Sequence, residues 1–410
     1  MGEFTAVSAE DQAIGERVRV IRRRRGLSAE TAAGLAGIDK SFLSRLERGE
    51  RAFVRRGLLE NLATALGCSV ADLTGQPYLS VDRDTQAALA AIPDVAATLH
   101  DCTLSDVPDV PARPIGELVT GAVAALAYSD NVELHRAGDG LGALLTELHV
   151  HAVTGDGDTK RTALAALVEA CIVARALAGT MGHVDLAVAA ARRGYDAART
   201  LERPDLIGFM AMGRTMTLGR VGARRRALRV ASQVLAELPT GPAGADTRAT
   251  EARGMLHLSA ALISARGGSA SDAETHLGEA RALAEAVGER NALRFHFGRA
   301  NVAAWDVAVA VENGTGPDAA ARFEAAGIDP HAFHSRDREA SVHLDLARAW
   351  AQADGDRDGA VVRALDTADR LAPIRVRSDP IARDLVVELH RRARRRVWEL
   401  DSLRNRLGVA

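Results

Sequence analysis

The chain has 410 residues, of which 47% are hydrophobic and only 3% are aromatic, and its formal net charge is −2. This length exceeds one ordinary core and predicts at least two domains, and the charge excludes a chain that is basic throughout. Abundant alanine with few aromatic residues favours closely packed helices over a β-sandwich, which uses valine, threonine and tyrosine. We therefore predict an all-α fold.

The charge is unevenly distributed. Residues 14–56 contain twelve Arg or Lys and five Asp or Glu, a net charge of +7, so the remainder carries −9. A basic module on an acidic body indicates that only one part meets phosphates. The three cysteines, Cys68, Cys102 and Cys171, form no Cys-x-x-Cys pair, which argues against a disulfide framework or a zinc ribbon and suits a reducing cytoplasm. We find no signal-peptide pattern and expect no membrane-spanning segment, so we predict a cytoplasmic protein with no membrane partner.

The first 76 residues predict five short helices. A helix over 12–25 buries Ile14, Val18 and Ile21 at helical spacing and ends at Gly26. A helix-turn-helix follows over 28–51, and two more helices follow over 55–66 and from Ser69. In the helix-turn-helix, the first helix is capped by Ser28, the turn is made by Gly37, and the second helix is capped by Asp39.

The second helix of this motif has two different sides. Leu43 and Leu46 hold it against the first helix, whose packed side we predict to be Ala32, Ala33, Leu35 and Ala36. The outer side carries Lys40, Ser41, Ser44, Arg45 and Arg48. An apolar inner side and a hydrogen-bonding outer side predict a recognition helix for the major groove of duplex DNA. The alternative is an ordinary helical hairpin whose outer side happens to be basic.

The predicted DNA contacts follow from position along this helix. Lys40, Ser41 and Arg45 are candidates for base edges, and Arg45 could donate two hydrogen bonds to guanine, worth about 1–3 kcal/mol of discrimination. Phosphate contacts are predicted for Ser44, Arg48 and Arg51. Ser28, Arg22 and Arg25 complete the candidate set, although the arginine run 22–25 could instead be a solvated face that complements the helix dipole.

Residues 12–76 resemble the Cro/lambda-repressor-type domain, also called the xenobiotic-response-element (XRE) family. The resemblance lies in Leu27-Ser28, Ala33, Leu35-Ala36-Gly37-Ile38 and the run from Phe42 to Gly49. It implies a five-helix DNA-binding domain over about a sixth of the chain. Two positions depart from the family: Ala29 stands where glutamine is common, and no proline follows the glycine loop at 52–54.

A repeat begins beyond a linker that we predict at 77–85, between domains at 10–76 and 86–410. An aromatic residue or leucine followed three residues later by alanine recurs at Tyr195/Ala198, Leu228/Ala231, Leu277/Ala280, Phe323/Ala326 and Leu365/Ala368. Each pair marks the second helix of a hairpin, with first helices predicted at 162–178, 205–218, 247–264, 292–311 and 338–351. Stacked hairpins predict an α-solenoid with a concave inner wall. The last hairpin resembles a tetratricopeptide repeat, and the C-terminal third is similar to actinomycete regulators that join an XRE domain to such an array.

The other candidate sites are weaker. His149 with His151, and His331 with His334, lack the converging geometry of a metal site, and Gly155 to Asp158 lacks the ligand spacing of a calcium loop. No nucleophile elbow, phosphate loop or dinucleotide fingerprint is present. We therefore expect no metal, no cofactor and no enzymatic activity.

The inner wall carries the candidates for an effector site. Asn291, Arg294, His296, Arg299 and Asn301 are predicted on one inner helix and Met212 on another. They could bind a peptide or small molecule, or the polar ones could simply be solvated and the methionine core. The sequence thus predicts a homodimeric transcriptional regulator that binds a double-stranded DNA operator and senses an effector. The alternatives are a protein-interaction adaptor and a constitutive repressor with a structural body.

Overall fold

The computed structural model describes residues 13–51, 53, 55–68, 70–74, 83–240, 246–353, 357–393 and 397–409. These residues are all-α, and their β-structure is limited to one isolated bridge between Arg290 and Phe297. The fold class predicted from the sequence is confirmed. The predicted helix starts at Gln12 and Ser69 and most of the predicted linker lie outside the described residues, so the proposed domain boundaries remain predictions.

The N-terminal part, residues 13–74, is here called the head. Its helices are α1 (Ala13–Arg24), α2 (Ala29–Ala36), α3 (Lys40–Glu47), α4 (Arg56–Leu66) and α5 (Val70–Thr74). The predicted apolar stripes are buried in α1, α3 and α4, because Val18, Leu43, Leu46 and Leu59 are all inaccessible to solvent. One prediction was wrong: Leu35 is 62% exposed, since it points away from the side of α2 formed by the buried alanines.

Residues 83–409 are here called the body. They begin with α6 (Arg83–Ala90), α7 (Ile92–Asp101), α8 (Ile115–Asp130), α9 (Leu134–Gly138) and α10 (Leu141–Thr154). Five helix pairs follow: α11 (Gly157–Thr180) with α12 (Val184–Thr200), α13 (Pro204–Arg220) with α14 (Arg224–Glu237), α15 (Thr247–Arg266) with α16 (Ala270–Val287), α17 (Arg299–Asn313) with α18 (Gly316–Ala325), and α19 (Arg336–Trp350) with α20 (Asp358–Leu371). The chain ends with α21 (Pro373–Arg377), α22 (Pro380–Arg392) and α23 (Trp398–Leu407), and a 3-10 turn spans Pro330–Phe333.

The pairs stack as an α-solenoid. The two helices of each pair contact each other, and the first helices α11, α13, α15, α17 and α19 also contact one another in sequence. Small residues make this possible, because Ala198, Ala231, Ala280 and Ala368 are buried at the crossings. Ala326 is exposed, because α18 ends one residue before it. α18, with 10 residues, is the shortest second helix of the five pairs.

One further expectation failed in the body. The first helix predicted from residue 292 begins only at Arg299, and residues 288–298 form an irregular loop in which Arg294 and His296 adopt positive φ.

Among the described residues, α11 is long and apolar enough to span a membrane, by length and composition alone. Its apolar window is 67% buried inside the protein, where it packs against α8, α10, α12 and α13, so it serves here as a core helix.

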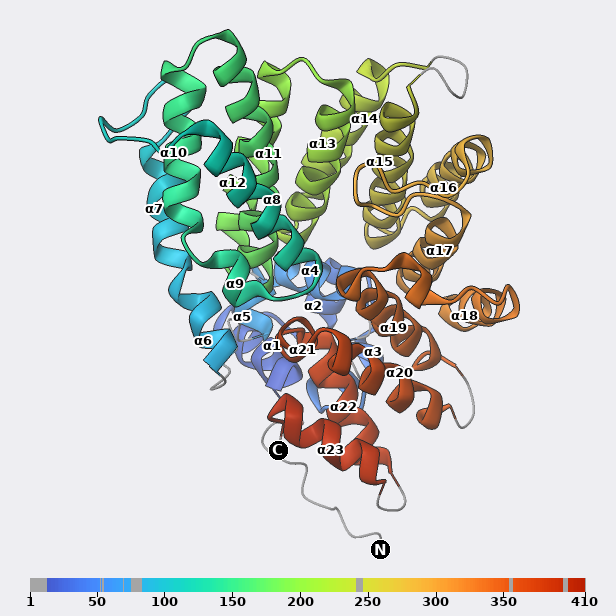
Figure 1. The fold of residues 1–410 in the computed structure, drawn as a ribbon. Coiled ribbons are helices and arrows are strands. Elements are labelled where there is room, and N and C mark those ends of the chain that lie inside the picture. Colours follow the sequence, from blue (N-terminus) through green and yellow to red (C-terminus); the bar gives the residue numbers. More distant parts are fainter. Residues whose placement is uncertain are drawn as a thin grey trace, which may run out of the picture.

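The body curves around the head. In Figure 1 the chain rises through α6–α12, passes over α13–α16 to α17–α20 and returns through α21–α23, and helices α1–α5 lie on the inner side of this arc. Head and body share one apolar core: buried residues of the head, such as Leu62 and Phe53, belong to the same cluster as Phe323, Leu365 and Leu385 of the body. The head is therefore packed into the body over an apolar contact as well as being linked to it by the chain.

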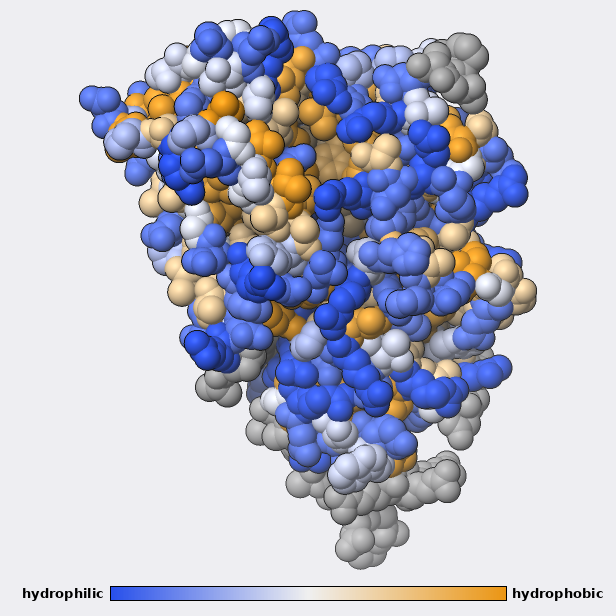
Figure 2. Space-filling view, viewed as in Figure 1, coloured by the Kyte–Doolittle hydropathy of each residue, from blue (hydrophilic) through white to orange (hydrophobic). Residues whose placement is uncertain are grey.

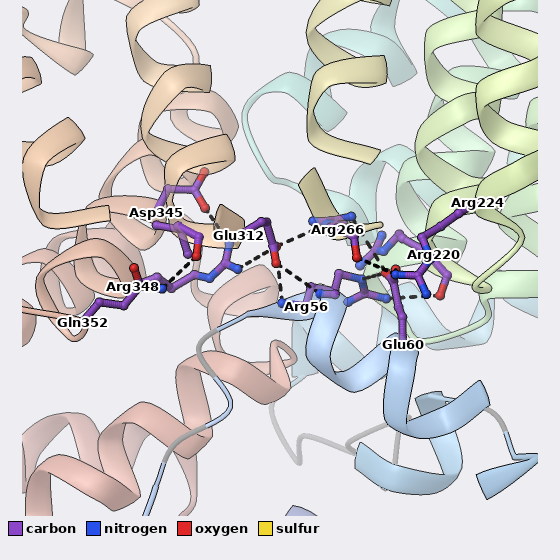
Figure 3. Close-up of polar contacts among 11 residues, drawn as sticks. Arg56, Glu60, Arg220, Arg224, Arg266, Glu312, Asp345, Arg348 and Gln352 are labelled. Atoms are coloured by element: carbon purple, nitrogen blue, oxygen red, sulfur yellow. Dashed lines mark hydrogen bonds and ion pairs between the residues drawn. The ribbon is translucent and has the colours of Figure 1, made fainter. Parts of the chain in front are cut away.

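A buried cluster of charges completes this contact. We call it the head–body ion cluster; it consists of Arg56 and Glu60 of α4 and Arg266, Glu312 and Arg348 of the body. Figure 3 shows these side chains converging between α4 and the body helices. Glu312 lies at its centre, because its carboxylate accepts hydrogen bonds from Arg348 at 2.9 Å and from Arg266 at 3.2 Å.

Glu312 also caps a helix of the head. The N-cap residue of α4, Arg55, offers no side-chain hydrogen bond. The Glu312 carboxylate instead accepts the backbone N–H groups of Gly57 at 3.1 Å and Arg56 at 3.3 Å. Burial alone would raise the pKa of Glu312, but Arg348, Arg266 and these hydrogen bonds outweigh it and lower the pKa to about 2. A carboxylate of the body thus satisfies the positive end of a head helix.

Close backbone contact fixes the same helix against α15. A Cβ atom at Gly57 would lie 2.8 Å from the carbonyl oxygen of Arg266, so only glycine permits this approach.

The surface in the view of Figure 1 is mostly hydrophilic, and hydrophobic residues show mainly in its upper half, over the segments from α8 to α13 (Figure 2).

Candidate nucleic-acid interface

The helix-turn-helix of the head is built by two caps and one turn. Ser28 Oγ accepts the backbone N–H of Thr31 at 3.0 Å, and Asp39 Oδ1 accepts that of Ser41 at 2.6 Å. The hydrogen bonds from the Ser41 side chain and backbone lower the pKa of Asp39, which keeps this cap ionised. Gly37 makes the turn with φ of 70°, a conformation that costs glycine little. All three roles predicted from the sequence are seen in the structure.

The inner side of the recognition helix α3 packs closely against α1. A Cβ atom on Gly15 of α1 would collide with the backbone of Leu46, so glycine lets α1 and α3 pack closely. Beside this contact, Arg22 donates to both carboxylate oxygens of Glu47, at 2.6 and 2.7 Å, and to the carbonyl oxygen of Leu27 at 3.0 Å. Both side chains of this ion pair are largely buried. The pair fixes the orientation of α3 relative to α1.

The outer side of α3 is open. Its five predicted side chains line one shallow hollow on the surface: Lys40, Ser41, Ser44, Arg45 and Arg48. The structure therefore brings these candidates together on one face, with Leu43 and Leu46 buried on the other. An eight-residue helix with an open polar face and a buried apolar face has the side-chain arrangement that a recognition helix needs.

The two arginines of this face differ in their partners. Arg45 lies with its guanidinium carbon 6.0 Å from the centre of the Phe42 ring, and its Nε is buried without a hydrogen-bond acceptor among the described residues. Arg48 instead pairs with Glu50, with 2.8 Å between Nη2 and Oε2, and this hydrogen bond raises the pKa of Arg48. Arg48 thus has a carboxylate partner, whereas Arg45 lies near an aromatic ring.

The remaining candidates divide into structural and exposed residues. Ser28 caps α2, and Arg22 holds Glu47, so both have a structural function within the head. Arg25 donates to the carbonyl oxygen of Gly67 at 2.8 Å and joins the end of α1 to the end of α4. Because its side chain is committed to Glu47, Arg22 is not available to a phosphate. Arg51 lies exposed in the loop after α3.

The candidates for an effector site do not converge. Asn301 is fully buried, donates to the carbonyl oxygen of Phe295 at 2.7 Å and accepts from Arg338 at 2.7 Å. Met212 is a core residue, 8% exposed. These two expected ligand contacts are structural instead, because their side chains are already enclosed by the protein.

The other effector candidates lie in or beside the loop 288–298. Asn291 accepts the backbone N–H of His296 at 3.0 Å, and Arg294 pairs with Asp130 of α8 at 2.6 Å. Burial lowers the pKa of His296 to about 4. Through these contacts the loop reaches from α16 to α8, so it covers part of the inner wall rather than presenting it.

Arg299 is the effector candidate that lines a groove. This groove runs between α16, α17 and α18, has an apolar floor that includes Val302 and Phe323, and has a charged rim of Arg281, Arg299, Asp306 and Arg322. Arg299 pairs with Glu285 on one side of it. Among the described residues no three His, Cys, Asp or Glu side chains are arranged to hold a metal ion.

Sequence reasoning missed the body residues near the recognition helix. Arg391 of α22 donates to the carbonyl oxygen of Glu50 at 3.3 Å, across 341 residues of sequence. No local pattern signals such a contact, although the basic run at the end of α22 is visible in the sequence.

The comparisons with known proteins agree with the geometry of the head. Residues 13–74 match the family described as a helix-turn-helix domain, so this part of the chain is a helix-turn-helix domain. No curated protein matches the chain. A solved structure of Bacillus thuringiensis PlcR in complex with the peptide PapR7 and DNA is similar at 11% sequence identity and a TM-score of 0.29, covering 84% of this chain and 100% of that one.

Proposed function

We propose that this chain is a cytoplasmic, sequence-specific transcriptional regulator without enzymatic activity, which binds duplex DNA through the outer side of α3. The observation that carries the proposal is the open face of Lys40, Ser41, Ser44, Arg45 and Arg48, on a helix whose inner side is fixed by buried contacts. The helix-turn-helix match of residues 13–74 supports it independently.

Within this face we assign different roles to the two arginines. Arg45 reads a guanine edge, because its side chain lines the open outer face of α3 and its guanidinium fork matches O6 and N7. Arg48 and Arg51 contact phosphates, because they lie at and beyond the C-terminal end of α3, and we assign Ser44 to a phosphate with them. Phosphate contacts position the protein on the duplex and carry no sequence information.

The experiment is genome-wide selection of bound fragments with the full chain, followed by binding measurements on the selected duplex. We expect Arg45→Ala to reduce the preference for the selected sequence by about 5- to 160-fold, the equivalent of about 1–3 kcal/mol. Arg48→Ala should weaken specific and non-specific duplexes alike and reduce the salt dependence. Arg161→Ala, on the exposed start of α11, is the control. A wild-type chain that binds no chromosomal fragment at modest ionic strength refutes the function.

We further propose that the protein is a homodimer and that its body senses a peptide or small-molecule effector. Two recognition helices on a symmetric dimer fit half-sites about 34–36 Å apart. The packed head–body contact supports coupling, because a change in the curvature of the body also moves the head. The groove at Arg299 supports a ligand site. Sedimentation with and without the selected duplex tests the dimer, and thermal stabilisation by a small-molecule or peptide fraction of cell extract tests the effector.

A further inference from the structure

The end of α22 lies against the loop that follows the recognition helix. Arg391 Nη2 donates to the carbonyl oxygen of Glu50 at 3.3 Å, and the Asp384 carboxylate of the same helix accepts the backbone N–H of Phe53. Phe53 and Leu385 of α22 belong to one buried cluster. The body therefore holds α22 in a fixed position beside α3.

This position corresponds to the edge of the groove that α3 would enter. The N-terminal residues of a recognition helix contact base edges, so residues just beyond its C-terminal end would lie nearer the sugar–phosphate backbone. Glu50 is three residues beyond the end of α3, and its carbonyl oxygen accepts a hydrogen bond from Arg391. The guanidinium of Arg391 therefore lies at this end of α3.

The charged groups at this point can accept phosphate. Arg391 and Arg392 are both exposed, and each pairs with a carboxylate, Arg391 with Glu388 at 3.0 Å and Arg392 with Asp358 at 2.6 Å. The Arg392–Asp358 pair is exposed on both sides, and pairs of this kind contribute only about 0–1 kcal/mol, so a phosphate can replace Asp358. The Glu388 side chain is only 13% exposed, so Arg391 would contact a phosphate while keeping this partner. Arg51 of the head also interacts electrostatically with Glu388, so it lies close to this end of α22.

We propose that the C-terminal end of α22 is a second DNA-binding surface, on which Arg391 and Arg392 bind backbone phosphates that flank the groove occupied by α3. The proposal rests on the proposed function of α3. It gives the body a direct part in DNA binding: the body contributes affinity, and the head contributes sequence preference. The partner is the backbone of the same duplex, without base recognition.

The test compares the full-length wild type with Arg391→Ala/Arg392→Ala by fluorescence anisotropy on the selected duplex and on a random duplex, over a range of salt concentrations. Each lost phosphate contact reduces the slope of log K against log salt by about 0.9, so we expect a reduction of about 1–2 on both duplexes. The preference for the selected duplex should not change. Arg161→Ala/Arg192→Ala is the matched control, because these arginines are also exposed and paired with carboxylates, on α11 and α12.

A second variant separates charge from local structure. Arg391→Lys keeps the charge and should retain most of the salt slope, whereas a purely structural role for the hydrogen bond to Glu50 predicts the same loss as alanine. An unchanged slope in Arg391→Ala/Arg392→Ala, with wild-type thermal stability and specific binding intact, overturns the inference and leaves the function of α3 standing. A wild-type chain that binds no duplex overturns both.

Discussion

Replacing Glu312 by glutamine tests the contact between head and body. Glu312→Gln keeps the shape and one acceptor oxygen but removes the charge that Arg266 and Arg348 surround. A pKa lowered from 4.5 to about 2 corresponds to about 3 kcal/mol of stability at neutral pH, because each tenfold change in proton affinity is worth about 1.4 kcal/mol. We therefore expect the free energy of unfolding to fall by about 3 kcal/mol at pH 7, in line with the cost of breaking a buried ion pair.

The pH dependence gives this prediction its sign. Because folding lowers the pKa of Glu312, its contribution is complete above about pH 4.5 and is lost as the pH falls toward 2. The difference between wild type and Glu312→Gln should therefore be largest at pH 7 and should shrink as the pH approaches 2.

Equilibrium urea unfolding followed by circular dichroism measures this difference at a series of pH values. Glu285→Gln is the control, because Glu285 is exposed and pairs with Arg299 at the surface, where a change of no more than about 1 kcal/mol is expected. The reasoning fails if Glu312→Gln is as stable as the wild type at pH 7, or if the loss is the same at every pH.

Three further changes have distinct expected outcomes. Gly254→Ala should lower the free energy of unfolding by about 1–3 kcal/mol in urea titrations, because its Cβ would overlap the buried Phe297 ring, whereas Gly278→Ala, in open space on α16, should not. Burial lowers the pKa of His149 to about 4, so the wild type should lose stability as the pH falls from 6.5 toward 4, and thermal melts of His149→Gln should lack that part of the loss. Arg22→Ala should lower the melting temperature and binding to all duplexes together, because it leaves Glu47 buried and unpaired; a loss of DNA affinity at unchanged melting temperature would instead indicate a phosphate contact.

The elements that the sequence predicts well are those with local signals. Ser28, Gly37 and Asp39 set the ends of α2 and α3, and the structure has both helices where these residues indicate. The five helix pairs follow from the recurrence of a large residue and an alanine three positions apart, because that spacing places both on one side of a helix. Leu35 shows the limit of the argument: in so short a helix, a residue about 100° away from the buried alanines is already exposed.

The features that sequence reasoning missed depend on long-range partners. Residues 291–298 mix polar and apolar side chains as an amphipathic helix does, but they form a loop, in which the Glu251 carboxylate accepts the backbone N–H groups of Ala292 and Leu293. Arg22 cannot be told from its three neighbouring arginines until Glu47 is placed beside it. The head–body ion cluster joins residues from 56 to 348, and charged side chains so far apart give no periodic signal.

The cap that Glu312 supplies to α4 restricts how this protein can evolve. A head transplanted onto a different body would begin α4 with two backbone N–H groups that lack their carboxylate acceptor. This body, without its own head, would keep the Glu312 carboxylate and its arginine partners but lose the backbone donors of α4. Recombination that exchanges whole modules is therefore penalised on both sides of the junction. New operator preferences are reached more readily by single substitutions on the outward side of α3, which neither the cap nor the shared core constrains.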